Sequence, residues 1–378
     1  MRDEMKKVPR LRFRGFSEDW ELCKLGELIE SFDSERIPID SSLRISGQYP
    51  YYGATGIIDY IDSYIFDGEY VLLAEDGANI IMRNYPVAYL TQGKFWLNNH
   101  AHIMRMVKGD NQFLVQILEK MNYSKYNTGT AQPKLNSNIV KRINLRVPIP
   151  EEQQKIGTLF KQLDDTITLH QRKSDQLKEL KKAYLQLMFP TKEERVPKLR
   201  FADFEGEWEL CKLNGILDII KGTQKSKSEL STNQNNCTPY PVYNGGINPS
   251  GYTNIYNREN AITISEGGNS AGFVNFVQEK FFSGGHNYTI VNNVTDTLFL
   301  FFYLCSIQEE IMRLRVGTGL PNIQKPTLMN LEIQKTTDNE QKSIGLFLKN
   351  IDILISLTQN KLNQLKSLKK SYLQNMFI

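Results

Sequence analysis

The sequence has few of the features that mark an enzyme. None of its four cysteines forms a Cys-x-x-Cys pair, so neither a zinc site nor a disulfide framework is expected. It has no glycine-rich phosphate loop ending in Gly-Lys-Ser/Thr, and it lacks the Asn/Asp-Pro-Pro-Tyr/Phe motif of enzymes that methylate an exocyclic amine. We therefore expect no catalytic residue and no metal ligand in this chain.

An excess of one charge is also missing. The 46 Lys and Arg against 42 Asp and Glu leave a net charge of +4 over 378 residues. Such a balance argues against a protein that grips nucleic acid by charge alone, so partners would supply much of any phosphate contact. No signal peptide or long apolar run is present, which predicts a cytoplasmic protein.

What the sequence does contain is a long internal repeat. Residues 151–189 return as residues 339–377, with 21 of 39 positions identical and an offset of 188. A shorter stretch, residues 8–25, returns as residues 196–213 at the same offset. The protein must therefore be understood as two related halves.

Residues 151–189 and 339–377 each carry apolar side chains on a seven-residue grid, which predicts a coiled-coil seam on a long helix. The first helix is expected to follow Pro150, and the second to begin with a capping box of Thr337 and Glu340. Each helix needs a partner, either the other helix of this chain or a helix of a second chain, and we favour the first. The predicted seam residues are Ile156, Leu163, Leu177, Tyr184, Ile344, Ile351, Leu365 and Tyr372.

The segments between these repeats, residues 26–150 and 214–338, contain short Val-, Ile-, Tyr- and Phe-rich runs broken by Gly and Asn, with one helical stretch each. This pattern predicts an α+β structure with exposed turns. We divide the chain into domains at residues 1–150 and 191–338, with long helices at residues 151–190 and 339–378. Faint repeats align residues 75–79 with residues 265–269, and His100 with His286.

The turns of both segments carry residues that suit DNA reading. Asn, Gln, Arg and Lys supply the hydrogen bonds that distinguish base edges, and glycines let the backbone approach phosphates. Glu75 and Asp76 are also candidates for the paired carboxylates of a nuclease, although a Glu-Asp-Gly turn is the simpler interpretation. The candidate DNA-binding residues are Arg36, Tyr52, Thr55, Asp76, Asn79, Asn99, His100, Thr130, Gln132, Lys134, Lys221, Thr223, Gln224, Lys225, Tyr243, Asn244, Glu266, Asn269, Ser270, His286, Thr318 and Asn322.

Three features together resemble a known family, the specificity subunits of type I restriction–modification systems. They are the repeated Gly-Thr-x-x-Pro at residues 129–133 and 317–321, the Glu-Gln-x-x-Ile-Gly helix starts, and the Leu-Lys-x-Leu-Lys-Lys-x-Tyr-Leu-Gln-x-Met-Phe helix ends. The resemblance covers essentially the whole chain. It implies two mixed α/β target recognition domains related by pseudo-two-fold symmetry, separated by two long helices that form an antiparallel coiled coil.

The resemblance also implies a function. A subunit of this kind is non-catalytic and binds double-stranded DNA, and each domain reads one half of a bipartite target. Two methylation subunits would use S-adenosylmethionine to methylate adenine N6, and restriction subunits would use ATP and Mg to cleave unmodified DNA. The alternative is a coiled-coil adaptor whose two heads bind proteins; unlike heads favour DNA reading over such a scaffold.

Overall fold

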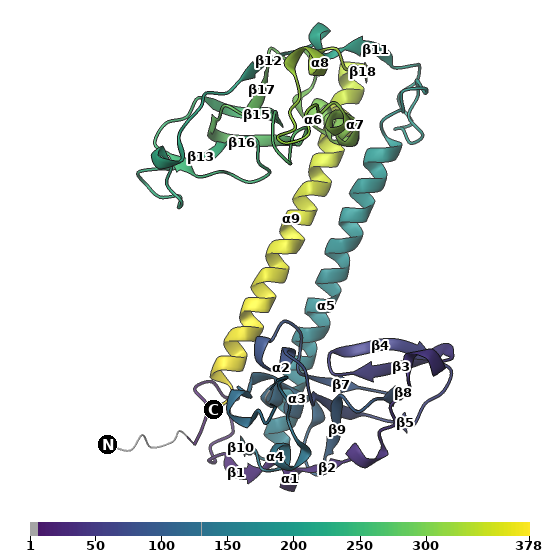
Figure 1. Cartoon of the computed structure of the whole chain (residues 1–378), viewed down its shortest axis with the longest axis vertical. Helices are drawn as coiled ribbons and strands as arrows, with labels where there is room; N and C mark the ends of the chain where they lie inside the picture. The colour runs from purple at the N-terminus through teal and green to yellow at the C-terminus, as the bar shows by residue number, and fades with distance from the viewer. Residues whose placement is uncertain (1–6, 130) are drawn as a thin grey trace. The chain divides into compact units, whose positions relative to one another are not determined.

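The computed structural model describes residues 7–129 and 131–378 and separates into two compact units. Unit 1 comprises Met1–Gln171 and Asn360–Ile378, and unit 2 comprises Arg172–Gln359. Each unit therefore holds one β-rich segment and parts of both long helices, which are drawn in teal and yellow in Figure 1. This division cuts each long helix near its middle, and the finer four-part division of the chain stays a prediction.

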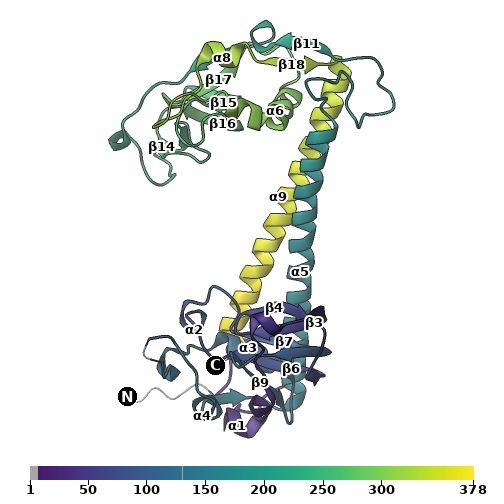
Figure 2. The same ribbon diagram turned by 45° about the vertical axis from the view of Figure 1, so that its right-hand side comes forward.

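Unit 1 is built from two four-stranded sheets and a two-stranded ribbon. Buried side chains of β6 alternate between two cores, so this strand forms the shared wall of the unit. Helix α3 packs on β6 and β7 (Figure 2). The elements are β1 (Glu21–Lys24) with β10 (Asn144–Val147); the sheet β2 (Ile29–Ser31), β9 (Ala101–Met106), β6 (Tyr70–Ala74), β7 (Ala88–Thr91); the sheet β4 (Gly56–Ile61), β3 (Ser46–Gly53), β8 (Lys94–Leu97), β5 (Phe66–Asp67); and the helices α1 (Leu25–Leu28), α2 (Asn79–Met82), α3 (Asn111–Lys120), α4 (Ser137–Lys141).

Unit 2 joins the equivalent strands into one six-stranded sheet beside a similar ribbon. The one helical stretch expected in the second segment is two helices, α6 and α7, with a break at Ile307. The elements are β11 (Glu209–Lys212) with β18 (Glu332–Lys335); the sheet β12 (Asp218–Lys221), β17 (Asn287–Val291), β15 (Arg258–Ser265), β16 (Val274–Ser283), β13 (Tyr240–Tyr243), β14 (Tyr252–Thr253); and the helices α6 (Thr297–Ser306), α7 (Gln308–Arg313), α8 (Lys325–Met329).

The two long helices, α5 (Pro150–Leu187) and α9 (Asp338–Asn375), pack against each other within this one chain. In unit 1, Phe160 of α5 contacts Phe377, just beyond the end of α9, and Asp164 bonds Lys369, so rising numbers on α5 meet falling numbers in the partner segment. The helices are therefore antiparallel here. The mixed α/β class and the pairing of the helices within the chain are both confirmed.

Unit 2 repeats this pairing with the helices exchanged. Lys181 of α5 bonds Asp352 of α9, and these two residues are the repeat equivalents of Lys369 and Asp164. At the seam positions the side chains of Ile156, Leu163, Ile344, Ile351 and Leu365 are buried, whereas Leu177, Tyr184 and Tyr372 are half-buried.

The repeated tryptophans at the start of each half are packing residues. Trp20 is 1% exposed and its ring meets that of Phe377 edge-on at 6.2 Å. Trp208 is 2% exposed and meets Phe189 in the same way, also at 6.2 Å. Each tryptophan thus joins the entrance of a domain to the end of a long helix.

The glutamate at the start of each long helix is paired with an arginine. Glu152 is fully buried and takes two hydrogen bonds of 2.7 Å from Arg12. Glu340 is also fully buried and bonds Arg200 at 2.7 and 2.8 Å, together with the Thr336 hydroxyl. The capping-box interpretation of Glu340 is therefore wrong, because its carboxylate clamps an arginine of the preceding segment.

Among the residues that the structure describes, no helix is long and apolar enough to cross a membrane.

Candidate nucleic-acid interface

Three loops of unit 1 are fastened together by backbone hydrogen bonds. The Glu75 N–H donates to the His100 carbonyl at 2.9 Å, and the Glu75 carbonyl accepts from the Leu135 N–H at 2.7 Å. The Gly77 N–H donates to the Pro133 carbonyl at 3.0 Å. Loops that lie far apart in the sequence therefore form one surface, which we call the loop cluster of unit 1.

The Glu75 carboxylate lies at the centre of this cluster. It accepts from Arg36 at 2.6 Å and lies 3.4 Å from the Lys134 ammonium and 3.7 Å from a ring nitrogen of His102. Arg36 also donates to the Ala101 carbonyl at 2.7 Å, and its side chain is only 12% exposed. Arg36 thus joins a fourth loop to the cluster, and Lys134 is the more exposed of the two cations, at 47%.

His100 and His102 of unit 1 differ in exposure. His100 is 53% exposed, and its Nδ1 lies 2.8 Å from a carboxylate oxygen of Asp76. His102 is buried between Asp33, at 2.8 Å, and the Leu135 carbonyl, at 2.7 Å. Burial pushes the pKa of Asp33 upward, but hydrogen bonds from His102 and the Ile103 N–H outweigh it and lower that pKa to about 2. His102 therefore supports the cluster, whereas His100 is presented on it.

Unit 2 builds its loop cluster with the same backbone bonds. The Glu266 N–H donates to the His286 carbonyl at 2.9 Å, and the Glu266 carbonyl accepts from the Ile323 N–H at 2.8 Å. The Gly268 N–H donates to the Pro321 carbonyl at 2.9 Å. These bonds make Glu266 the equivalent of Glu75.

The sequence alignment of this loop was therefore wrong by one residue. It placed Glu75 opposite Ser265 and Asp76 opposite Glu266, because the two Gly-containing turns look alike in either register. The strand pairing corrects it, since Asp76 bridges Lys134 while Gly267 bridges Asn322. Unit 2 thus has a glycine where unit 1 has Asp76, and His286 loses that carboxylate partner.

Different side chains surround Glu266. It bonds Lys221 at 2.5 Å and accepts from the Tyr288 hydroxyl at 3.2 Å. Tyr288 also donates to the Ile323 carbonyl at 3.1 Å, which is the place that His102 takes in unit 1. Burial and the neighbouring Glu266 carboxylate raise the pKa of Tyr288 to about 12. His286 is 59% exposed and lies 3.9 Å from Glu266.

The arrangement offers hydrogen-bond donors and acceptors. Within residues 7–129 and 131–378, no three His, Cys, Asp or Glu side chains are grouped so that they could hold a metal ion. The central glutamates are engaged by Arg36, Lys134 and Lys221, and exposed amides, hydroxyls and histidines surround them. Such groups recognise base edges and phosphates.

Sequence comparison decides what this architecture belongs to. The model of the type I restriction modification DNA specificity domain matches residues 17–179 and again residues 205–367. The chain belongs to this family. The double match shows that it is a type I specificity subunit with two recognition domains, and it favours DNA reading over the adaptor alternative.

Individual relatives agree. The MjaVIII specificity subunit of Methanocaldococcus jannaschii is 25% identical over 93% of this chain and 91% of that protein. A Haemophilus influenzae protein, provisionally described as a type I restriction enzyme specificity subunit, is 38% identical, but the match spans about a third of each protein, 35% and 34%. The crystal structure of the M. genitalium S subunit has the same fold, with a TM-score of 0.76 over 98% of this chain and 99% of that one, at 14% identity.

Within this specificity subunit, the predicted DNA-binding residues that the structure describes fall into three groups. Some are used by the loops themselves: besides Arg36, the amide of Asn79 bonds backbone groups of Tyr85 and Pro86, and Lys225 is 14% exposed and lies over Phe282. Thr130 lies outside the described residues. Those with exposed side chains are Thr55, Asn99, His100, Gln132, Lys134, Lys221, Thr223, Gln224, Asn269, His286, Thr318 and Asn322; Tyr52, Asp76, Tyr243, Asn244, Glu266 and Ser270 are half-buried.

Sequence reasoning missed the supporting residues. Glu75, Asn98, His102 and Tyr288 were not among the predicted site residues. Asn98 is 5% exposed and its side chain accepts from the His100 N–H at 2.9 Å. A signal was present, since His102 lies inside the apolar run Ala101–Met106, where a buried polar side chain needs a hydrogen-bond partner.

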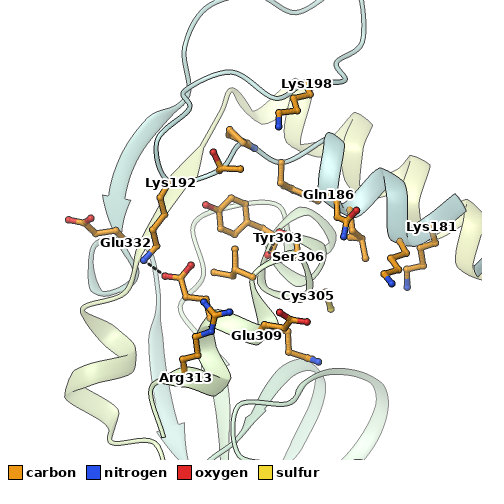
Figure 3. A pocket seen from close by; sticks show the side chains of 18 of the residues that line it. Lys181, Gln186, Lys192, Lys198, Tyr303, Cys305, Ser306, Glu309, Arg313 and Glu332 are labelled. Carbon is orange, nitrogen blue, oxygen red and sulfur yellow. Dashed lines mark hydrogen bonds and ion pairs between the residues drawn. The ribbon is translucent and has the colours of Figure 1, made fainter. Parts of the chain in front are cut away.

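Unit 2 of the subunit also contains a cavity of about 800 Å³ between the end of α5 and helices α6 and α7 (Figure 3). Its lining combines Phe189 and Tyr303 with several lysines, and Lys192 forms an ion pair with Glu310 across it. The lining holds five lysines and one arginine against three glutamates, so positive charge predominates in it. None of the predicted DNA-binding residues lines it.

Proposed function

We propose that the two loop clusters read DNA, and that each recognition domain reads one half of a bipartite target. The observation that carries this is the shared frame with different contents. Both clusters are closed by the same three backbone bonds, yet the exposed side chains on them differ. A repeated frame with unlike reading residues is suited to two unlike half-sites.

The exposed residues suggest how bases would be distinguished. Amide side chains such as Gln132 and Gln224 can bond adenine with two hydrogen bonds, and lysines such as Lys134 and Lys221 can bond guanine or phosphate. Arg36 and Asn79 are proposed to act indirectly, by holding the loops. Each correct base contact would contribute about 1–3 kcal/mol of discrimination.

We propose that the chemistry belongs to partner subunits. In the family as described above, the specificity subunit is non-catalytic. Two methylation subunits would transfer a methyl group from S-adenosylmethionine to adenine N6, and restriction subunits would use ATP and Mg to cleave unmodified DNA. The complex would work in the cytoplasm, where the DNA is. A relative in this fold, 18% identical with a TM-score of 0.51, comes from a study of type I complex assembly.

A domain exchange tests the proposal. Residues 26–150 would be replaced by the corresponding domain of another family member, and adenine methylation would be mapped genome-wide in cells that express the methylation subunit. One half of the methylated sequence should change while the other half stays the same. Changes in both halves would contradict separate reading, and methyl transfer by the purified chain alone would contradict the non-catalytic role.

A further inference from the structure

A cluster of two tyrosines and one lysine stands outside the loop cluster of unit 1. The rings of Tyr49 and Tyr64 have centroids 5.0 Å apart and planes inclined by 57°. The Lys94 ammonium lies 4.7 Å from the centroid of the Tyr64 ring. Tyr64 is 40% exposed, so the cluster is open to solvent.

Unit 2 contains a second cluster of two tyrosines and one lysine with the same geometry. The rings of Tyr240 and Tyr256 have centroids 5.0 Å apart and planes inclined by 57°. The Lys280 ammonium lies 4.6 Å from the centroid of the Tyr256 ring, and Tyr256 is 43% exposed. The sequences of the two segments have otherwise largely diverged, so two exposed residues and one half-buried tyrosine that share one geometry stand out.

The strands place both clusters near the reading loops. Lys94 begins β8, whose other end leads into Asn98 and His100; Tyr49 lies on β3, three residues before Tyr52. At about 3.3 Å per strand residue, the cluster lies roughly 10–13 Å from the loops along these strands. Unit 2 has the same arrangement on β13 and β16. That distance is within the width of a DNA duplex, so DNA seated on the loops would pass close by.

The chemistry of each cluster suits a phosphate. The ammonium and the tyrosine hydroxyls are hydrogen-bond donors, and the ring beneath the lysine holds its charge in one place. A hydrogen bond with the Tyr64 hydroxyl raises the pKa of Lys94, and one with the Tyr256 hydroxyl raises that of Lys280. Both lysines therefore stay charged. Across the strand pairs, Asp67 lies opposite Lys94 and Glu259 lies opposite Lys280. These carboxylates limit the attraction between each cluster and a phosphate.

We propose that the clusters of Tyr49, Tyr64 and Lys94 and of Tyr240, Tyr256 and Lys280 are phosphate-binding sites that hold the DNA backbone beside each half-site. This inference rests on the proposed function, because it needs the loop clusters to bind DNA. The sites contribute affinity without reading sequence, since a phosphate is the same at every base. They also help a chain with so little net charge to hold a polyanion.

The test is the salt dependence of DNA binding by the chain assembled with its methylation subunits. Each lysine that contacts a phosphate adds about 0.9 to the slope of log affinity against log salt. The K94A and K280A variants should each lower the slope by about one, and the double variant by about two. The methylated sequence should stay unchanged. The Y64F and Y256F variants should weaken binding several-fold while keeping the slope.

A matched control is K155A. Lys155 also lies over an aromatic ring, that of Phe16 at 4.9 Å, but it belongs to α5 and not to the reading strands. Its loss removes one charge and one ring contact and should leave the slope unchanged. An unchanged slope in the folded double variant would overturn the inference, and so would a changed methylated sequence. If the unmodified complex binds no DNA, the proposed function itself fails.

Discussion

The loop clusters of the two units agree in their backbone and differ in the side chains at their centres. In unit 1 the central glutamate, Glu75, has an arginine and a lysine as partners and a buried histidine beside it. In unit 2 the equivalent Glu266 has one lysine and a tyrosine. What the repeat has kept is the position of a carboxylate between crossing loops, and the groups that neutralise it have been replaced.

One contact shows this replacement most directly. The His100 N–H donates to the side chain of Asn98 in its own loop, at 2.9 Å. The His286 N–H donates to the side chain of Asn244 in a different loop, at 3.0 Å. The equivalent backbone N–H is therefore bonded by an asparagine from its own loop in unit 1 and by an asparagine from another loop in unit 2. The backbone requires an acceptor at this point, and either loop can provide it.

The largest effect is expected where the two units are the same. Replacing Glu152 by Ala should leave the part-buried Arg12 without its partner, and replacing Glu340 should do the same to Arg200. Breaking a buried ion pair by removing one partner costs about 3–5 kcal/mol. Urea unfolding of both variants measures this cost, and hydrogen exchange shows which unit is affected.

The neighbouring Glu151 provides the control, because it is exposed. Its replacement by Ala should change the stability by less than about 0.5 kcal/mol. Equal losses in the E151A and E152A variants would mean that the helix start, and not the clamp, sets the stability.

The second effect is a loss of stability at low pH that is expected in unit 1 and not in unit 2. The pKa of Asp33 is about 2 when folded, below the value near 3.9 of an unfolded chain. A depressed pKa stabilises the folded state above pH 4, and this contribution is lost as the pH falls from about 4 to about 2. The loss should be about 2 kcal/mol in unit 1. Unit 2 has Tyr288 at the place of His102, and Tyr288 does not titrate in this range.

The measurement compares urea unfolding of the original chain and the D33N variant at pH 5 and at pH 2. The difference in unfolding free energy between the two chains should shrink by about 2 kcal/mol at the lower pH. A difference that is constant with pH would show that Asp33 contributes no titratable stability.

A third effect concerns the repeated helix glycines. A Cβ at Gly157 would lie 1.9 Å from a carboxylate oxygen of Asp110, whereas a Cβ at Gly345 would lie 2.9 Å from Asp296. Gly to Ala inside a helix otherwise stabilises by about 1 kcal/mol. We therefore expect the G157A variant to lose about 1–2 kcal/mol and the G345A variant to lose less.

Thermal unfolding checks this order, with the G215A variant as a control, since a Cβ at Gly215 meets no atom within 4 Å. Equal effects of the two helix variants would mean that the closer approach in unit 1 relaxes at no cost.

Much of the fold could be predicted from the sequence because the residues that pack the domains against the helices are identical in the two halves. Identical residues at Trp20 and Trp208, and at Phe189 and Phe377, reveal the joints between the domains and the helices. The helix seam followed from periodicity. Both are local or repeated signals, which a single sequence can show.

The centres of the loop clusters could not be predicted in the same way. Glu75 gains its meaning from Arg36 and Lys134, which lie 39 and 59 positions away in the sequence. The one-residue alignment error arose because the side chains there differ, and only the backbone bonds fix the register. Exchanged partners such as Asn98 and Asn244 leave no repeated pattern in the sequence.

The smallest effect tests that exchange. Replacing Asn98 by Gly should remove the acceptor for the His100 N–H and cost about 1–2 kcal/mol of local stability. Gly53 is the repeat equivalent of Asn244, and a Cβ there would lie 3.3 Å from the Asn98 amide. Combining N98G with G53N should therefore restore the bond from the other loop, as in unit 2.

Unit 2 permits the reverse exchange, N244G with G284N. A Cβ at Gly284 would lie within 2.9 Å of Asn244 side-chain atoms, so G284N alone should clash, and the pair should not. Neither Gly53 nor Gly284 has a positive φ, so asparagine fits both backbones. Hydrogen exchange of the His100 and His286 amides, measured with DNA binding, reports the outcome. Each double variant could instead exchange these amides as fast, and bind DNA as weakly, as its single variants. The two amides would then not be equivalent, and the loop frame would depend on more than one acceptor at this point.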